Sequence, residues 1–219
     1  MPEHSPQSTP AQVREAAAPT KLTAAGRSRT IYNPMIGDHA TFLKSTEETN
    51  GESLLIRVEL PAHGGAKTAR HLHLQSAETF VVIEGELTVE NGSDVVVLKV
   101  GDSATAAPRA HHRYLSASDL PCVFEVEIRP AGRTEDGLRL IYGLARDGRS
   151  GPNSVPRNPL ELALGAQYSD MYLASLPVWV QKAIFGGLAS IARMVGTEKR
   201  FARYLEPEPD FKPASRTAL

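Results

Sequence analysis

The stretch from Gly65 to Gly85, GAKTARHLHLQSAETFVVIEG, constrains the fold more than any other part of the chain. Its first half carries two histidines, His71 and His73, and its second half contains Glu78 followed by an apolar, β-branched run. Side chains alternate between faces along a strand, so both imidazoles are expected on one face of a first strand. An antiparallel second strand would set the Glu78 carboxylate beside them. The pattern predicts a strand, a turn and a strand around two imidazoles and one carboxylate.

Two nitrogen ligands and one oxygen ligand form a set that suits Fe, Mn, Ni, Co or Zn. We therefore expect one divalent transition metal and a fourth ligand elsewhere in the chain. A second histidine-bearing stretch, GDSATAAPRAHHRYLS, runs from Gly101 to Ser116. It contains the adjacent pair His111 and His112, of which only one can face the ion if the segment is a strand.

The first stretch resembles the first motif of the cupin superfamily without a gap. The matching residues and their spacing are Gly65, five residues, His71, one residue, His73, four residues, Glu78, six residues and Gly85. In the family's second motif a histidine stands eleven residues after a glycine, and the corresponding residues here are Gly101 and His112. The resemblance implies that His71, His73, Glu78 and His112 are the metal ligands.

The chain departs from the second motif in the turn before the histidine. The family's proline and second glycine correspond to Ala107 and Arg109, whereas this chain has its proline one residue later, at Pro108. His111 therefore remains a rival for the fourth position. His112 is favoured because its spacing from the motif's first glycine is preserved.

The resemblance covers roughly residues 29–130 and implies an all-β jelly-roll barrel. The residues agree with this fold class: short segments of alternating apolar and polar residues, such as Leu54–Leu60, are separated by turn residues with no helix between them. We expect a disordered leader over residues 1–28, the cupin barrel over 29–130, helices that pack on the barrel or on a dimer partner over 131–205, and a flexible tail over 206–219.

The C-terminal extension has the sequence signals of helices. Thr134 is followed by two acidic residues and an apolar pattern of helical period, and Asn158 precedes Pro159 as a helix cap. The second helix is expected to run through LELALGAQYSDMYLASL, and a third through VWVQKAIFGGLASIARMVG. A short charged helix is expected after a cap at Thr197.

Composition narrows the class of partner. The 219 residues include 24 basic and 25 acidic side chains, so nucleic acid is not an expected partner. Lys182 and Arg193 interrupt the longest apolar segment, which is then too short to span a bilayer. The single cysteine, Cys122, lies in an apolar run and is expected to be a buried, inert thiol compatible with a cytoplasmic location. A homodimer and a small-molecule substrate are expected.

Three histidines and one glutamate around a divalent ion would leave coordination positions open. By resemblance to cupin enzymes, the expected function is a metal-dependent oxygenase or dioxygenase that acts on a small enolisable or aromatic molecule, with Glu78 taking up a proton. Tyr114 should share the face of His112 and either donates a hydrogen bond to substrate or only packs. Two alternatives remain: a non-redox isomerase or cyclase that uses the metal as a Lewis acid, and a non-catalytic small-molecule-binding protein.

Overall fold

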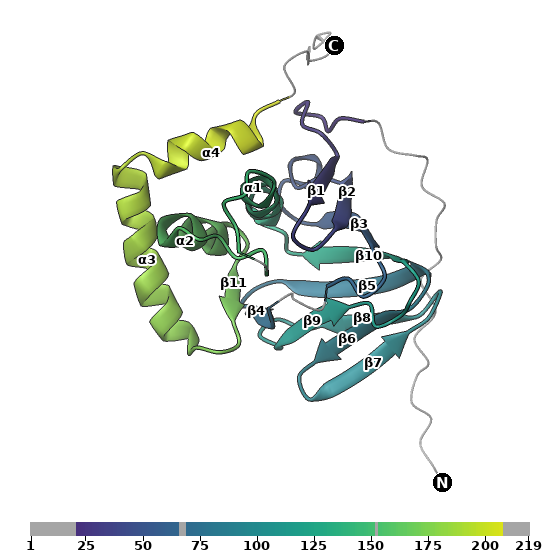
Figure 1. Ribbon diagram of the computed structural model, residues 1–219. Helices are drawn as coiled ribbons and strands as arrows, with labels where there is room; N and C mark the ends of the chain where they lie inside the picture. The colour runs from purple at the N-terminus through teal and green to yellow at the C-terminus, as the bar shows by residue number, and fades with distance from the viewer. Residues whose placement is uncertain (1–20, 66–68, 152, 208–219) are drawn as a thin grey trace.

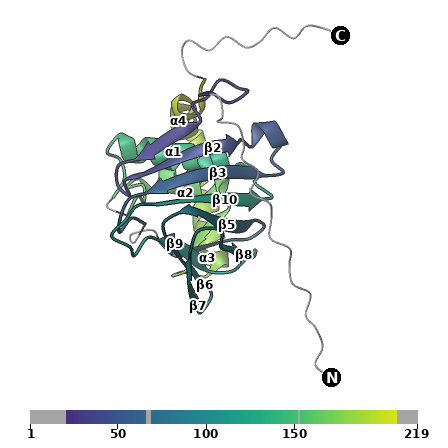
Figure 2. The ribbon, with the colours of Figure 1, turned by 90° about the vertical axis from the view of Figure 1, so that its right-hand side faces the viewer.

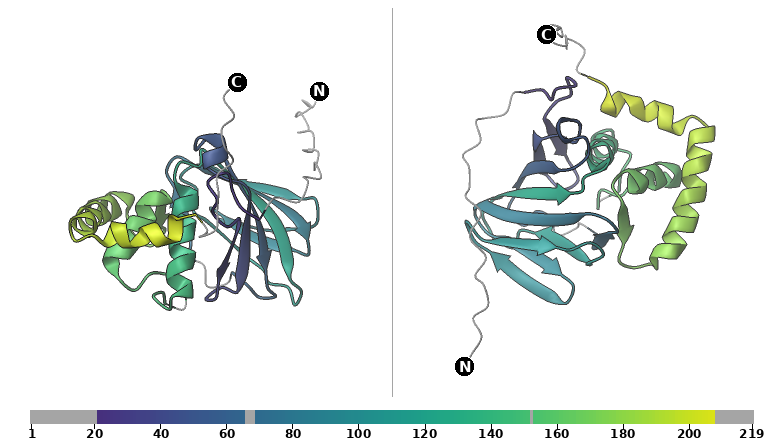
Figure 3. Two further views of the ribbon diagram at one scale, coloured as in Figure 1. Left: turned by 90° about the horizontal axis from the view of Figure 1, so that it is seen from above. Right: turned by 180° about the vertical axis from the view of Figure 1, so that it is seen from behind.

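The structure is a computed structural model that describes residues 21–65, 69–151 and 153–207 (Figure 1). Two antiparallel sheets face each other, and the helices of the C-terminal extension lie together on one side of them (Figures 1 and 3). The strands are β1 (Thr30–Asn33), β2 (Asp38–Lys44), β3 (Leu54–Leu60), β4 (His71–His73), β5 (Ala77–Glu84), β6 (Leu87–Asn91), β7 (Asp94–Leu98), β8 (Ser103–Ala106), β9 (His112–Leu115), β10 (Cys122–Arg129) and β11 (Met171–Leu173). The helices are α1 (Thr134–Arg146), α2 (Pro159–Tyr168), α3 (Val178–Met194) and α4 (Thr197–Leu205), with a short 3-10 turn at Glu47–Thr49.

The strands form a jelly-roll sandwich of one six-stranded and one five-stranded sheet. The first sheet has the order β1-β2-β3-β10-β5-β8, and the second has the order β11-β4-β9-β6-β7. Figure 2 shows β2, β3, β10 and β5 of the first sheet side by side. The expectation of a barrel closed on itself was wrong. Strand β4 pairs with β9 on one side and with β11 on the other, so it has no free edge with which to join the six-stranded sheet. At the far edge of the five-stranded sheet from β11, strand β7 pairs with β6 and with no other described strand.

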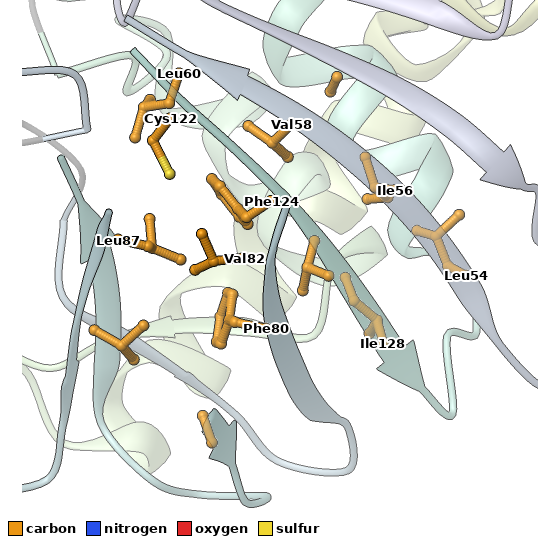
Figure 4. Packing of buried hydrophobic residues seen from close by; sticks show 14 of the residues in the cluster. Leu54, Ile56, Val58, Leu60, Phe80, Val82, Leu87, Cys122, Phe124 and Ile128 are labelled. Carbon is orange, nitrogen blue, oxygen red and sulfur yellow. The ribbon is translucent and has the colours of Figure 1, made fainter. Parts of the chain in front are cut away.

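Apolar side chains from both sheets fill the space between them (Figure 4). The alternation in β3 is typical: Leu54, Ile56, Val58 and Leu60 are buried while the residues between them are less so. Strand β10 lies between β3 and β5 and extends this pattern across the sheet. Burial of apolar area is the main favourable contribution to this packing.

The helices of the extension form a second apolar cluster against the sandwich. Leu140 and Leu144 of α1 pack with Leu164 of α2 and Phe201 of α4, and all four are buried. On its other side α1 contributes Tyr142 to the sandwich core. Helix α1 therefore joins the two clusters.

The second helix is shorter than the sequence predicts. It begins as expected, with the Asn158 side chain accepting a hydrogen bond from Leu160 N at 2.9 Å, but it ends at Tyr168. Residues Met171–Leu173, which we expected to be helical, form β11 and pair antiparallel with β4. Asp170 makes the break, since its backbone is left-handed, with φ of 48°. Strand pairing with a distant segment overrides the local helical pattern.

Two further boundaries differ from the sequence expectations. Residues 21–28, assigned to a disordered leader, contain the buried Arg27, which forms ion pairs with Glu47, Glu135 and Asp136. The last helix begins at Thr197, one residue earlier than expected, and its capping residue is Gly196. The Thr197 hydroxyl, which we expected to cap the helix, accepts a hydrogen bond from the Arg200 side chain at 2.9 Å. Residues 1–20 of the expected leader and 208–219 of the expected tail lie outside the described residues.

Candidate metal centre

The four sequence-predicted metal ligands come together between the two sheets. His71 and His73 lie on β4, and His112 of β9 stands directly opposite His71 in the register of the pair. Glu78 lies on β5, in the other sheet. All four are buried, and one ligand atom from each lies within 4.8 Å of the others. These residues could hold a metal ion.

The route by which Glu78 reaches the histidines differs from the expected hairpin. Strands β4 and β5 do not pair with each other, because β4 belongs to the five-stranded sheet and β5 to the six-stranded sheet. The turn between them carries the chain across the sandwich. Glu78 then approaches the imidazoles from the facing sheet, so the cluster is built from both layers.

The ring nitrogens of the three histidines divide into an outer and an inner set. Each Nδ1 lies within hydrogen-bonding distance of a backbone carbonyl: His71 with Ala69 O at 2.9 Å, His73 with Ser169 O at 2.9 Å, and His112 with Ala110 O at 3.0 Å. A carbonyl can only accept, so each Nδ1 carries the proton. In the neutral imidazole each Nε2 then has a free lone pair, as a metal ligand requires.

The inner nitrogens surround the carboxylate. Nε2 of His73 lies 3.1 Å from Glu78 Oε1, and Nε2 of His112 lies 3.2 Å from Glu78 Oε2. Burial, together with the neighbouring imidazoles, lowers the pKa of His71 to about 4. Burial also disfavours a charged His73, but the Glu78 carboxylate outweighs it and raises the pKa of His73. Burial works against ionisation of Glu78, yet His73 and His112 hold its pKa well below the usual range.

This charge pattern fits a divalent cation. A buried carboxylate facing three imidazole lone pairs needs positive charge among them, which either a proton or a metal ion can supply. Nε2 of His73 is buried and has no well-aligned hydrogen-bond partner among the described residues. The donor set of three neutral imidazoles and one carboxylate suits a first-row transition metal.

The altered turn before His112, the fourth proposed ligand, keeps the register expected from the resemblance. Arg109 occupies the position of the family's second glycine and adopts φ of 70°, the left-handed conformation that glycine adopts most easily. Its amide donates to His73 O at 2.6 Å. The turn therefore places His112 in the cluster, whereas the rival His111 is exposed and outside it.

Two glycines of the first stretch are required by close backbone contacts. Gly65 and Gly85 both have φ of +75°. A Cβ on Gly85 would lie 2.5 Å from Pro121 O, and a Cβ on Gly65 would lie 3.0 Å from Tyr114 O. Each glycine fixes an end of the segment that carries His71, His73 and Glu78.

Tyr114 lies beyond His112 on β9 and faces a cavity next to the cluster. Its ring packs edge-on against Phe124, with ring centroids 5.0 Å apart. Its hydroxyl has no hydrogen-bond partner within the described part of the chain. Burial and the nearby carboxylates of Asp38 and Glu78 raise the pKa of Tyr114, so the hydroxyl stays protonated and can donate a hydrogen bond.

Sequence reasoning missed the contribution of the C-terminal extension to the cluster. Ser169 O accepts the hydrogen bond from His73 Nδ1, and Asp170 Oδ2 accepts from the amides of Leu74 and Gln75 at 2.9 Å each. The only local signal is Ser169-Asp170, a pair of residue types common in turns, inside an otherwise helical pattern. It marks a break but cannot show what the break contacts.

Residues 57–128 match the family model of the cupin domain. This chain contains a cupin domain. The match begins in β3 and ends in β10, so it includes all four residues of the cluster and excludes the helical extension. A comparison with curated proteins finds no match.

Several solved structures are similar to part of this chain. A predicted oxalate decarboxylase from Thermotoga maritima is 20% identical, with 42% of this chain and 79% of that chain covered and a TM-score of 0.40. A sugar phosphate isomerase from Silicibacter pomeroyi is 22% identical, with 52% of this chain and 66% of that chain covered and a TM-score of 0.38. An RmlC-like cupin from Shewanella frigidimarina is 21% identical, with 46% of this chain and 83% of that chain covered and a TM-score of 0.40.

The remaining sequence expectations concern Cys122 and the apolar helix. Cys122 is free and fully buried next to Leu60 of β3, and burial raises its pKa to about 11. It is therefore an inert thiol, as expected. In the described residues no helix, α3 included, is long and apolar enough to cross a membrane.

Proposed function

We propose that this protein is a metal-dependent cupin enzyme, an oxygenase or dioxygenase that acts on a small enolisable or aromatic molecule. The observation that carries the proposal is the convergence of three imidazoles and one carboxylate in a cluster that lines a cavity through His71, His73 and Glu78. His71, His73, Glu78 and His112 are the proposed ligands. A bound divalent transition metal would supply a Lewis acid and the redox chemistry with dioxygen that an oxygenase needs.

Glu78 is the proposed proton acceptor. Its side chain lines the cavity, and each of its oxygens lies close to an imidazole. A proton removed from the substrate can pass to this carboxylate, because it lines the cavity that the substrate would occupy. The proton is then retained inside the cavity wall and away from solvent.

Tyr114 is the proposed substrate-orienting residue. Its protonated hydroxyl faces the cavity without a partner, so a substrate oxygen between Tyr114 and the cluster would accept its hydrogen bond. The Phe124 contact restrains the ring and limits where this bond can form. Tyr114 thereby holds the substrate oxygen toward the proposed ligands.

The experiment measures metal content and dioxygen uptake on the purified full chain. We expect about one divalent transition metal per chain, and oxygen-electrode uptake when a small enol or phenol is added to the metal-loaded protein. The variant His73→Ala should lose both the bound metal and the dioxygen uptake. Turnover of an added substrate without dioxygen uptake would favour the non-redox isomerase or cyclase, and retention of a ligand without turnover would favour a binding protein.

A homodimer is the proposed assembly, and the outer face of α3 supports it. Trp179 and Met194 are 75% and 80% exposed on this helix. Between them lie Gly186 and Gly187, where an added Cβ would meet no atom of the described chain within 4 Å. Interior helix glycines are costly, and close approach of a second α3 would account for them. Light scattering on the purified chain tests the assembly, and a monomer at all concentrations would contradict it.

A further inference from the structure

The cavity beside the metal cluster has a volume of about 180 Å³ and two apolar walls. One wall is the inner face of the six-stranded sheet, with Ile56, Val58 and Val126. The opposite wall comes from the C-terminal extension, with Ile141, Leu162 and Leu173 on α1, α2 and β11. The cluster lines the same cavity through His71, His73 and Glu78.

The charges around the cavity are acidic. Among the described lining residues Glu78 is the only charged side chain, and none is lysine or arginine. Asp38 lies just behind Tyr142, whose hydroxyl donates to it at 2.5 Å, and it is fully buried. A phosphate or a dicarboxylate is normally recognised by arginine or lysine, and this cavity offers neither.

Several of the polar groups that line the cavity are already engaged within the protein. The Tyr142 hydroxyl is used by Asp38, and the Asn33 amide donates to Ser154 Oγ at 2.7 Å. Tyr114, whose hydroxyl has no partner among the described residues, lies two residues after His112 on β9 and lines the same cavity as His71, His73 and Glu78. The Tyr114 hydroxyl is therefore free to bind a ligand oxygen near the metal end, whereas most of the other lining side chains are apolar.

The size sets a limit on the body of the ligand. An apolar protein cavity of about 150 Å³ is known to hold a benzene molecule. The cavity here is slightly larger, which leaves room for one ring and small substituents. Apolar walls on both sides favour a flat or compact hydrocarbon body.

We infer that the cavity takes an uncharged molecule with an apolar body the size of one ring and a single oxygen that faces Tyr114 and the cluster. This inference deepens the proposed function and rests on it only for the metal end. We expect phosphorylated sugars and small dicarboxylates to bind poorly, because the walls away from the cluster offer no arginine or lysine to a charged group. The C-terminal extension selects the ligand's apolar body, because it supplies a whole wall of the cavity.

Isothermal titration with two probes of the same ring tests the charge requirement. Phenol and phenyl phosphate are titrated into the full-length protein, once loaded with metal and once after chelation. Phenol should bind at a single site in both forms, and phenyl phosphate should bind at least tenfold more weakly than phenol in both. Equal or tighter binding of phenyl phosphate in either form, or no binding of phenol, would overturn the inference.

Two variants in the extension wall tie the binding to this cavity. Val155→Phe fills space at a half-buried residue that lines the cavity, so it should weaken the binding of phenol at least tenfold. The matched control Val95→Phe, on the exposed strand β7, should leave the binding of phenol unchanged. Leu162→Lys adds a cation to the wall and should strengthen the binding of phenyl phosphate at least tenfold. If phenol binds Val155→Phe as well as it binds the parent, or Leu162→Lys gains nothing, the ligand lies elsewhere.

The two proposals fail in different ways. A chain that takes up no metal would end the proposed function, yet phenol should still bind the metal-free cavity. A metal-loaded chain that prefers phenyl phosphate would leave the metal centre intact and overturn the ligand class alone.

Discussion

Asp170 fixes the turn that supports His73, although the two side chains lie on different parts of the fold. Its carboxylate accepts hydrogen bonds from two consecutive amides, Leu74 N and Gln75 N, both at 2.9 Å. The preceding residue, Ser169, holds the imidazole of His73 through its carbonyl. Asp170→Ala should therefore destabilise the fold and loosen the proposed metal site together.

The magnitude follows from the burial of the two amides. A hydrogen bond to a charged group contributes about 1.5–3 kcal/mol. Gln75 is exposed, so in the variant its amide can form a hydrogen bond with water instead. Leu74 is only half-exposed, so the loss of its hydrogen bond accounts for most of the cost. Alanine also tolerates the left-handed backbone of Asp170 poorly, at a cost of about 1–2 kcal/mol. The sum is about 2.5–5 kcal/mol, which corresponds to a fall in Tm of roughly 5–20 °C for a chain of this size.

The assay is thermal unfolding of metal-free and metal-loaded protein, with a metal titration beside it. Loss of an outer partner of a ligating histidine typically weakens metal binding about 10–100-fold. Asp170→Asn is the matched control, because asparagine keeps an acceptor and tolerates the left-handed backbone. It should show less than half the loss in Tm. If Asp170→Ala changes neither Tm nor metal affinity, the turn does not position His73 and the reasoning is refuted.

Three further predictions concern single residues elsewhere in the domain. His112→Ala should lose most metal uptake while His111→Ala keeps it, measured by metal analysis, and the reverse ranking would refute the assigned register. Arg109→Gly should raise the free energy of unfolding by about 0.5–1 kcal/mol in urea titrations, because glycine relieves a left-handed arginine; Arg109→Ala, which keeps the strain, should gain nothing. The pKa of Cys122 is raised from 9.0 to about 11 in the fold, so its contribution to stability is complete below pH 9 and is lost as pH rises from 9 to 11, by about 2–3 kcal/mol. The stability difference between the parent and Cys122→Ala should narrow over that range, and a difference independent of pH would contradict the shift.

The sequence alone predicts the parts of the site that depend on local spacing. Alternation on a strand is a property of neighbouring residues, so a spacing of two residues is enough to place His71 and His73 on one face. The antiparallel strands of the jelly roll and the cap of α2 at Asn158 were predictable for the same reason, whereas the open form of the sandwich was not. In each case the deciding signal lies within a few residues of the feature.

Contacts between distant segments could not be predicted in this way. The helical pattern around Met171 gives no sign that β4, almost a hundred residues earlier, offers a free edge for pairing. The partnership of His73 with Ser169 and the crossing of Glu78 from the facing sheet depend on how the layers meet. Such pairings are decided by tertiary packing, which local propensity does not encode.

The hydrogen bond between His73 and Ser169 also bears on when the site can mature during synthesis. Its two residues are separated by 96 positions, so His71, His73, Glu78 and His112 all leave the ribosome well before Ser169 does. Until β11 adds to the edge of β4, His73 lacks the partner that fixes its tautomer and orientation. Contacts of such long range form late in folding. A nascent chain therefore offers only a loosely held set of ligands, and tight capture of an ion is deferred until the extension has docked.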